Sequence, residues 1–284
     1  MTEAPAAGDI GLDLGATLTK VVLLEAGAPL LRFETRLFPR DDWPALDAFL
    51  AGRAGAFVSA TGAGARRLSK ESPGPRPVVL VDEFEAWGLG EQALLAGADF
   101  TPSRPHLLVS LGTGTSILRV DDGGRVVRVG GTGLGGGTLR GLGRLLLGES
   151  DHDILASLAA QGDRRKVDLL VRDLYGTGEI SLSGDLTAAN LGHVASHDPR
   201  DLAHAVVGLI GENVGLLAGA LSQCHGGGRP IDIVYAGSTL RGNAPLREVL
   251  AFTNSLIGAT SRFLPHGEFV GAVGALVAAR RRRP

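Results

Sequence analysis

Residues 9–20 read Asp9-Ile-Gly-Leu-Asp13-Leu-Gly-Ala-Thr17-Leu-Thr-Lys20, and the apolar run Val21-Val-Leu-Leu24 follows directly. Ile, Leu and Leu at positions 10, 12 and 14 alternate with Gly11 and Asp13, which is the period of a β-strand. We therefore expect a strand that enters a turn of small residues and a second strand that leaves it. Asp13 lies at the edge of that turn.

The turn has the composition of a phosphate-binding hairpin. Gly15 and Ala16 let the backbone approach a ligand closely, and Thr17 and Thr19 supply hydroxyl and amide donors for phosphate oxygens. Asp13 is placed to hold a hydrated cation. Because Gly and Thr are also common in ordinary turns, a tight β-hairpin without a ligand explains the same residues. This stretch alone leaves both interpretations open.

Composition narrows the class of protein. The chain has 284 residues and a net charge of -2, so we expect two lobes and neither a nucleic acid nor a membrane surface as partner. The most apolar run, Leu202–Cys224, is interrupted by His204, Glu212 and Asn213, and we expect no transmembrane span. Residues 1–8 lack the basic and apolar segments of a secretion signal, which predicts a cytoplasmic protein.

Two residue counts add to this. Cys224 is the only cysteine, so the chain forms no internal disulfide, and we expect a buried structural thiol. The 43 glycines gather at junctions between elements, which indicates that the backbone closely approaches a neighbour or a ligand. Lys20, inside the first hairpin, is one of three lysines in the chain; a solvated strand residue is an equally good explanation.

The order of elements repeats along the chain. After the first hairpin, we expect strands at 29–38, 56–60 and 78–81, a helix at 42–52 capped by Asp41 or Asp42, and a helix from 84 or 85 to 96. The Pro-rich connector 101–105 is the predicted boundary between lobes 1–105 and 106–284. The same order follows after this connector: a strand at 106–111, a Gly/Thr turn at 112–116, a strand at 117–120 and a third strand that ends at 129. Two such hairpins facing one another would clamp a polyphosphate.

The rest of the second half supplies further candidate ligand sites. The Gly-rich segment 130–138 precedes a helix at 139–147, where free N–H groups and the helix dipole suit an anion; a flexible linker is the alternative. Ser238 follows the predicted strand 231–236, at a strand end where a base or ribose usually lies. Further helices are expected at 151–160, 165–174, 187–193 (capped by Asp185), 200–224, 244–255 and 270–279, and a strand at 260–264. Gly208, Gly211, Gly215 and Gly219 lie largely along one side of helix 200–224, which predicts another helix against it.

Phosphoryl transfer needs a carboxylate to accept the acceptor's proton and cations to neutralise the moving group. Glu83, at a predicted strand end, is the candidate base. Its neighbours Asp82 and Glu85 are alternative candidates for that role. A structural alternative is that Glu83 is simply a carboxylate at the start of a helix, where the helix dipole favours it. Arg128 precedes the Gly-rich segment and could reach the phosphoryl group or pair across strands. His193 and His197 lack a convincing third metal ligand. The chain contains no Gly-x-Ser-x-Gly and no Walker motif.

Six motifs together resemble the type II pantothenate kinase family, in order from Gly8 to Ala279. They are Asp13-Leu-Gly-Ala-Thr-Leu-Thr-Lys20, Val109-Ser-Leu-Gly-Thr-Gly-Thr-Ser116, Arg128-Val-Gly-Gly-Thr-Gly-Leu-Gly-Gly-Gly-Thr138, Ser183-Gly-Asp-Leu-Thr-Ala-Ala-Asn190, Ile233-Val-Tyr-Ala-Gly-Ser238 and Gly271-Ala-Val-Gly-Ala-Leu276. The resemblance implies a two-lobed actin-like (ribonuclease H-like) ATPase fold with duplicated mixed β-sheet domains. It also implies ATP-dependent, Mg²⁺-assisted phosphorylation of pantothenate, the first step of coenzyme A synthesis, by a homodimer.

By position, the resemblance makes Glu83 the catalytic base and Arg128 the contact to substrate and phosphate. The positions matching ATP contacts are Gly15, Ala16, Thr17, Leu18, Thr19, Lys20, Thr113, Gly136, Gly137, Thr138, Leu139, Arg140, His152 and Ser238. Asp13 remains the candidate Mg²⁺ site. His152 stands where the family usually has an aromatic ring, Arg140 where an uncharged residue is usual, and Ala16 where Gly is frequent.

Two other functions fit parts of the pattern. A related kinase for another small alcohol, such as an amino sugar, would share the hairpins and differ in the acceptor pocket. An ATP-driven clamp or dehydratase activator would hydrolyse ATP without an acceptor. The lone Cys224 argues against an activator, because the resemblance to that class implies an iron–sulfur cluster held by two cysteines from each chain. Coenzyme A or its thioesters are further candidate ligands, as inhibitors.

Overall fold

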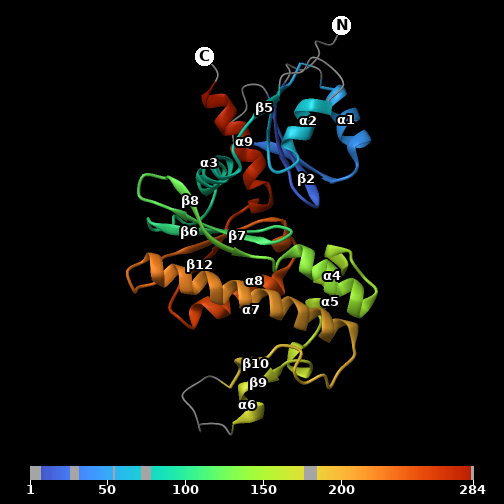
Figure 1. The fold of residues 1–284 in the computed structure, drawn as a ribbon, viewed down its shortest axis with the longest axis vertical. Coiled ribbons are helices and arrows are strands. Elements are labelled where there is room, and N and C mark those ends of the chain that lie inside the picture. The colour runs from blue at the N-terminus through green and yellow to red at the C-terminus, as the bar shows by residue number, and fades with distance from the viewer. Residues whose placement is uncertain (1–7, 26–31, 54, 72–77, 176–183, 283–284) are drawn as a thin grey trace.

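The computed structural model describes residues 8–25, 32–53, 55–71, 78–175 and 184–282. Two five-stranded sheets form its two lobes, and a small two-stranded sheet lies beyond the long helix α7 (Pro199–His225) (Figure 1). The first sheet carries the N-terminal strands and helices, and the second is built from strands after residue 105.

The first sheet has the strand order β3-β2-β1-β4-β5. Its strands are β1 (Asp9–Leu14), β2 (Leu18–Leu24), β3 (Phe33–Pro39), β4 (Phe57–Thr61) and β5 (Val78–Leu80). β2 runs antiparallel to β1 and β3, whereas β4 runs parallel to β1 and β5. Helices α1 (Trp43–Ala51), α2 (Ala65–Glu71) and α3 (Glu83–Leu95) connect the strands. The sequence pattern did not predict α2.

The second sheet repeats this arrangement in the order β12-β11-β6-β7-β8. It consists of β6 (His106–Leu111), β7 (Thr115–Val120), β8 (Val126–Thr132), β11 (Ile233–Ala236) and β12 (Ser261–Phe263). β7 is antiparallel to both neighbours, and β11 is parallel to β6 and β12. The predicted duplication of a strand, hairpin, strand unit is therefore confirmed.

Both faces of β6 are buried. Leu107 and Val109 belong to a core shared with α7 and α8 (Ala244–Ser255), while Leu108 belongs to a core shared with α3 and α9 (Val270–Arg281). The two-residue period of a strand thus sends alternate side chains into two different cores.

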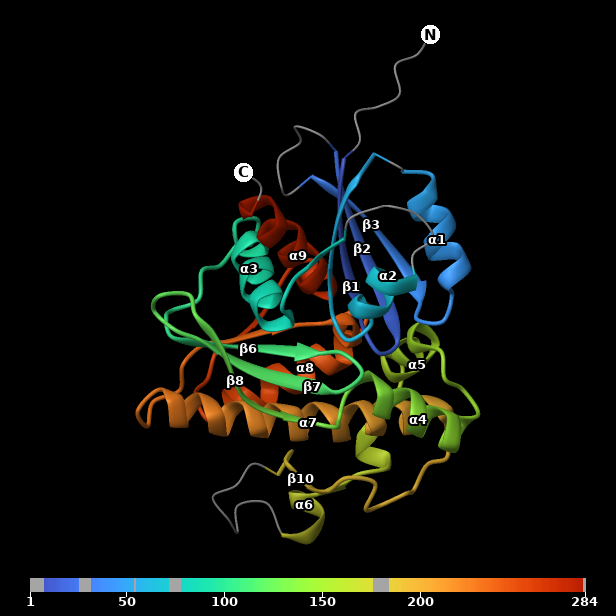
Figure 2. The same ribbon diagram turned by 45° about the horizontal axis from the view of Figure 1, so that its top comes forward.

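The C-terminal helix α9 lies beside α3, between the two sheets (Figure 2). It also packs against β1 and β4, so a helix from the second half of the chain covers the first sheet. The core around α3 and α9 contains Val22 of the first sheet and Val234 of the second. The boundary predicted at residue 105 stays a prediction, because both halves of the chain contribute to this shared core.

Three of the four stripe glycines of α7, Gly211, Gly215 and Gly219, face α8 or the segment just after it, as the spacing predicted, whereas Gly208 lies against the side chain of Arg164. A Cβ added to Gly211 would lie 2.7 Å from a methyl of Val249, and one added to Gly215 would lie 2.9 Å from Cβ of Thr253. These glycines let the two helices approach closely. Among the described residues, α7 is also the one helix long and apolar enough to span a membrane, yet 61% of that window is buried inside the protein.

Two predicted helices are wrong. Residues 165–174 form the 3-10 turn Arg164–Lys166, β9 (Leu169–Leu170) and the one-turn helix α6 (Val171–Leu174), and residues 187–189 form β10. Thr187 and Asn190 donate hydrogen bonds to Glu212 of α7, at 2.6 and 2.8 Å. These long-range bonds hold the segment extended. Asp185 pairs with Arg172 and caps no helix, and residues 181–183, which precede it in the expected loop 181–186, lie outside the described residues.

The expected burial of Cys224 is also wrong. Its side chain is exposed near the C-terminal end of α7. Its neighbour Ser222 is fully buried and donates to the carbonyl of Ile231. The thiol thus lies on the solvent side of the last turn of the helix.

Candidate active site

Two adjoining cavities open between the lobes. The larger has a volume of about 580 Å³ and the smaller about 360 Å³. Residues that line both are Ala16, Thr17, Leu18, Gly112, Thr113 and Ser238. The two cavities therefore meet at the β1–β2 and β6–β7 hairpins, the two turns that the sequence predicted to bind phosphate.

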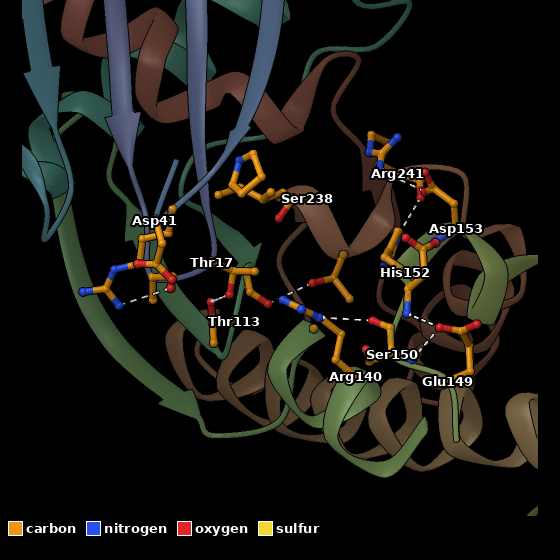
Figure 3. Close-up of a pocket in the computed structure, with 18 residues that line it drawn as sticks. Thr17, Asp41, Thr113, Arg140, Glu149, Ser150, His152, Asp153, Ser238 and Arg241 are labelled. Atoms are coloured by element: carbon orange, nitrogen blue, oxygen red, sulfur yellow. Dashed lines mark hydrogen bonds and ion pairs between the residues drawn. The ribbon is translucent and has the colours of Figure 1, made fainter. Parts of the chain in front are cut away.

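The two hairpins touch. The hydroxyl oxygens of Thr17 and Thr113 are 2.8 Å apart, although the residues come from different sheets (Figure 3). Each turn is closed by its own backbone, since Gly15 N donates to Leu18 O and Gly112 N donates to Gly114 O. The contact brings the predicted phosphate clamp together at one point.

The Gly-rich segment supports the second hairpin. The N–H groups of Gly136 and Gly137, at the start of α4 (Gly136–Leu147), donate to the carbonyls of Gly112 and Thr113, both at 2.8 Å. The sequence predicted free N–H groups here, and for these two amides that is wrong. A Cβ on Gly135 would lie 2.8 Å from Cα of Gly114, so the close approach requires glycine.

The smaller cavity gathers the predicted catalytic residues. Asp13, Lys20, Glu83 and Arg128 all line it. Asp13 and Lys20 are directly opposite in the β1–β2 register, and Lys20 Nζ lies 2.9 Å from Asp13 Oδ2. Lys20 is therefore not a solvated strand residue but a partly buried ion-pair partner of the carboxylate at the hairpin.

The structure separates Glu83 from its two acidic neighbours. Asp82 is the N-cap of α3 and accepts hydrogen bonds from the N–H groups of residues 84 and 85. Glu85 pairs with Arg282 at 2.6 Å. Glu83, the first residue of α3, is the one of the three that lines the smaller cavity.

The environment of Glu83 favours its protonated form. Burial of the carboxyl is the largest effect that raises its pKa, and the negative charges of Asp13 and Asp82 raise it further, while Lys20 lowers it. A carboxylate with a raised pKa in a cavity has the properties of a general base.

Arg128 reaches the cavity from β8. A terminal nitrogen of its guanidinium lies 2.6 Å from where a Cβ on Gly131 would be, so the side chain folds back along its own strand. Its position near the hairpins suits contact with an anionic group.

The larger cavity has a polar rim made mostly by the second lobe. His152, the first residue of α5 (His152–Ala159), has Nε2 2.8 Å from the carbonyl of Arg241. A carbonyl only accepts, so Nε2 carries the proton. Arg241 also pairs with Asp153 at 2.9 Å, and Arg140 Nε donates to the carbonyl of Ser150 at 3.2 Å (Figure 3).

Not every residue predicted to contact ATP lines a cavity. Gly15, Ala16, Thr17, Leu18, Lys20, Thr113, Gly136, Arg140, His152 and Ser238 do so. Four of the predicted residues line neither cavity: Thr19, Gly137, Thr138 and Leu139. Thr19 and Leu139 are buried, and Thr138 donates to the carbonyl of Gly133. Sequence reasoning missed the lining residues Arg40, Asp41, Glu149, Ser150, Asp151, Asp153, Thr239 and Arg241. Arg40 and Asp41 could have been found, because they follow a strand that pairs with the hairpin strand.

A metal site made only of protein ligands is absent from the described residues, where no three His, Cys, Asp or Glu side chains cluster. His193 and His197 lie outside any helix, so the four-residue spacing does not bring them onto one face. Asp13 provides one carboxylate beside the hairpins. This fits Mg²⁺, which usually takes one or two carboxylates and completes its shell with phosphate and water.

Comparisons with known proteins identify the family. A family model described as Fumble matches residues 90–278. The chain is 36% identical to a type II pantothenate kinase of Oceanobacillus iheyensis and 34% identical to one of Staphylococcus aureus; each alignment covers 94% of this chain and 98% of the relative. The chain belongs to the type II pantothenate kinase family. The expectation of an ATP-dependent kinase is confirmed by this membership.

Solved structures confirm the fold class. An activator of 2-hydroxyisocaproyl-CoA dehydratase from Clostridium difficile, with bound ADPNP, superposes with a TM-score of 0.62 at 18% identity, covering 96% of this chain and 94% of the other. A ROK hexokinase from Thermus thermophilus gives 0.53 at 18% identity, covering 95% and 97%. The two-lobed actin-like ATPase fold is thereby established; similarity at this identity bears on fold alone.

Proposed function

We propose that this type II pantothenate kinase homologue transfers the γ-phosphoryl group of ATP to the primary hydroxyl of pantothenate, giving 4'-phosphopantothenate. The observation that carries the proposal is the position of Glu83. It is a half-buried carboxyl with a raised pKa, in a cavity that adjoins the contact between the two phosphate hairpins.

In this proposal the nucleotide occupies the larger cavity and the acceptor the smaller one. The triphosphate crosses from one to the other at Thr17 and Thr113, which line both cavities. Their hydroxyls now bond to each other, and they would exchange that bond for phosphate oxygens. Ser238, at the end of β11, and His152 lie on the nucleotide side.

The chemical step follows from these positions. Glu83 accepts the proton of the primary hydroxyl while that oxygen forms a bond to the γ-phosphorus. The bond between the γ-phosphorus and the bridging oxygen breaks, and ADP leaves with the bonding electrons. Arg128 offsets negative charge on the moving phosphoryl group, and Lys20 keeps Asp13 in place through their 2.9 Å ion pair.

Mg²⁺ belongs to the proposal as well. Asp13 would hold it, because this carboxylate is the acidic group at the first hairpin and one of its oxygens is engaged by Lys20. The ion would supply charge neutralisation on the phosphates. A homodimer, a cytoplasmic location and inhibition by coenzyme A or its thioesters are further expectations of family membership.

The direct test is phosphorylation of radiolabelled pantothenate by the purified protein with ATP and Mg²⁺. N-acetylglucosamine serves as the competing acceptor, and ATP turnover without acceptor is measured in parallel. We expect labelled phosphopantothenate and little turnover alone. Preferential phosphorylation of the amino sugar would instead support a related sugar kinase, and acceptor-independent hydrolysis would support an ATP-driven clamp.

A further inference from the structure

Trp87 forms an apolar wall of the smaller cavity next to the base. It lies four residues after Glu83 on α3, so both side chains project from the same face of the helix. Both line the smaller cavity. No sequence motif drew attention to this residue.

Trp87 is the one aromatic residue among those that line the smaller cavity. The other apolar side chains that line the smaller cavity are Ala16, Leu18, Ala63 and Val270, all smaller than an indole. Threonine, serine and charged side chains make up most of the remainder. The largest apolar side chain of this lining therefore lies about one helical turn from Glu83.

The indole is held in place. The ring of Phe84 packs edge-on against it, with centroids 6.1 Å apart and an interplanar angle of 71°. On the other side, a Cβ on Gly271 would lie 3.1 Å from Trp87 Nε1 and 2.9 Å from Asp13 Oδ2. The indole N–H edge is thus packed beside the start of α9 and the carboxylate of Asp13. A rigid aromatic wall costs little conformational entropy when a ligand binds.

The acceptor in the proposed function has a matching apolar group. The primary hydroxyl of pantothenate is on a carbon joined to a quaternary carbon that bears two methyl groups. When Glu83 accepts the hydroxyl proton, these methyls lie within a few bonds of it. We propose that Trp87 is a specificity-determining residue that packs against the two methyl groups and so selects a branched alcohol over a sugar hydroxyl. This inference rests on the proposed function.

The test compares two substrates in two variants. The substrates are pantothenate and its analogue that lacks both methyl groups, and the variants are Trp87→Ala and Trp87→Phe. For pantothenate, we expect Trp87→Ala to lower kcat/KM by about tenfold or more, because removing an apolar contact of methyl size costs roughly that much. For the analogue we expect a loss of less than about threefold, and Trp87→Phe should recover most of the activity on pantothenate.

If Trp87 had a purely structural role, Trp87→Ala would lower kcat/KM by the same factor for pantothenate and for the analogue, and that outcome would overturn the inference. The wild-type assay separates this result from failure of the proposed function. If the wild type does not phosphorylate pantothenate at all, the function itself is wrong. If the wild type phosphorylates pantothenate and Trp87→Ala loses kcat/KM equally on both substrates, only the role of Trp87 is wrong.

Fluorescence gives a second measurement that does not depend on turnover. The chain has two tryptophans, and Trp43 packs, partly buried, against the core of the first lobe and lines neither cavity. In a Trp43→Phe protein with a non-hydrolysable ATP analogue, pantothenate should change the emission of Trp87 in a saturable way, and the analogue without methyls should change it less. Equal responses to the two ligands would contradict a contact with the methyl groups.

Discussion

At the scale of single residues, Glu83 combines the position of the candidate base with a cost to the fold. Because its pKa is raised, the folded state favours the protonated carboxyl. Below the ordinary glutamate pKa, this carboxyl is protonated in both the folded and the unfolded chain, so it does not lower the stability of the fold. Above the raised pKa, the folded protein must hold the charge beside Asp13. Stability contributed by the neutral carboxyl is thus lost as pH rises through the raised pKa.

Glu83→Gln should therefore separate activity from stability. We expect turnover to fall about a hundredfold or more, since the base is lost, while ATP binding is retained. We also expect a higher Tm than the wild type at pH 8, with the difference disappearing near pH 4. Steady-state kinetics, nucleotide titration and thermal unfolding at the two pH values measure these effects. Comparable turnover in the variant would remove Glu83 from the mechanism.

Asp82 should tune the same group through its charge. Asp82→Asn keeps an N-cap residue at the start of α3 and removes a negative charge that raises the pKa of Glu83. We expect the acidic limb of the kcat/KM profile to move to lower pH. Glu85→Gln is the matched control, because Glu85 pairs with Arg282 and is not among the groups that shift Glu83. A shift in the control and none in Asp82→Asn would refute this electrostatic account.

At the scale of elements, the contact between α7 and α8 depends on small residues. Gly215→Ala would place a Cβ 2.9 Å from Cβ of Thr253, and we expect it to destabilise the protein by about 1–3 kcal/mol through overpacking. Gly141→Ala on α4 is the control, since nothing lies within 4 Å of its added Cβ; it should stabilise by about 0.5–1 kcal/mol. Urea unfolding measures both. Equal effects would show that helix propensity, not packing, governs the stripe.

Elements were predictable where the pattern is local. β1, β6 and α8 have the predicted bounds or differ by a residue or two. Their signals, which are apolar alternation, helix caps and helical period, depend on residues close together in the sequence. The segment 184–193 was not predictable, because Glu212, on a distant helix, determines the conformation of Thr187 and Asn190. The site divides in the same way. Glu83 and Arg128 follow from local motifs, whereas Trp87 became a candidate only when folding placed it in the cavity.

At the scale of the whole molecule, α3 carries the candidate base at one end and contacts the second sheet near the other. Its first residue is Glu83, and two turns later Glu91 is buried against His106 at the start of β6, with Oε1 2.8 Å from Nε2. His106 Nδ1 faces the carbonyl of Ser103. Glu91→Ala would leave the buried imidazole without this partner. We expect a loss of about 1–3 kcal/mol in urea unfolding, with Glu91→Gln losing less because its amide oxygen can still accept from His106; equal losses would argue that the carboxylate charge, and not a neutral hydrogen bond or side-chain volume, stabilises the pair.

The contact between the hairpins defines a closed arrangement of the lobes, and the chain allows a direct test of it. With Cys224 replaced by serine, Thr17→Cys combined with Thr113→Cys places two thiols where hydroxyl oxygens are now 2.8 Å apart. A disulfide requires Cα atoms about 4.4–6.8 Å apart, so it should form under mild oxidation only if the lobes close in solution as described.

The locked hairpins could not part to admit a triphosphate. We therefore expect ATP binding and kinase activity to disappear on oxidation and to return on reduction, while each single-cysteine variant stays insensitive to oxidant. Failure to form the disulfide, or full ATP binding by the oxidised protein, would show that the hairpins do not grip the triphosphate between them.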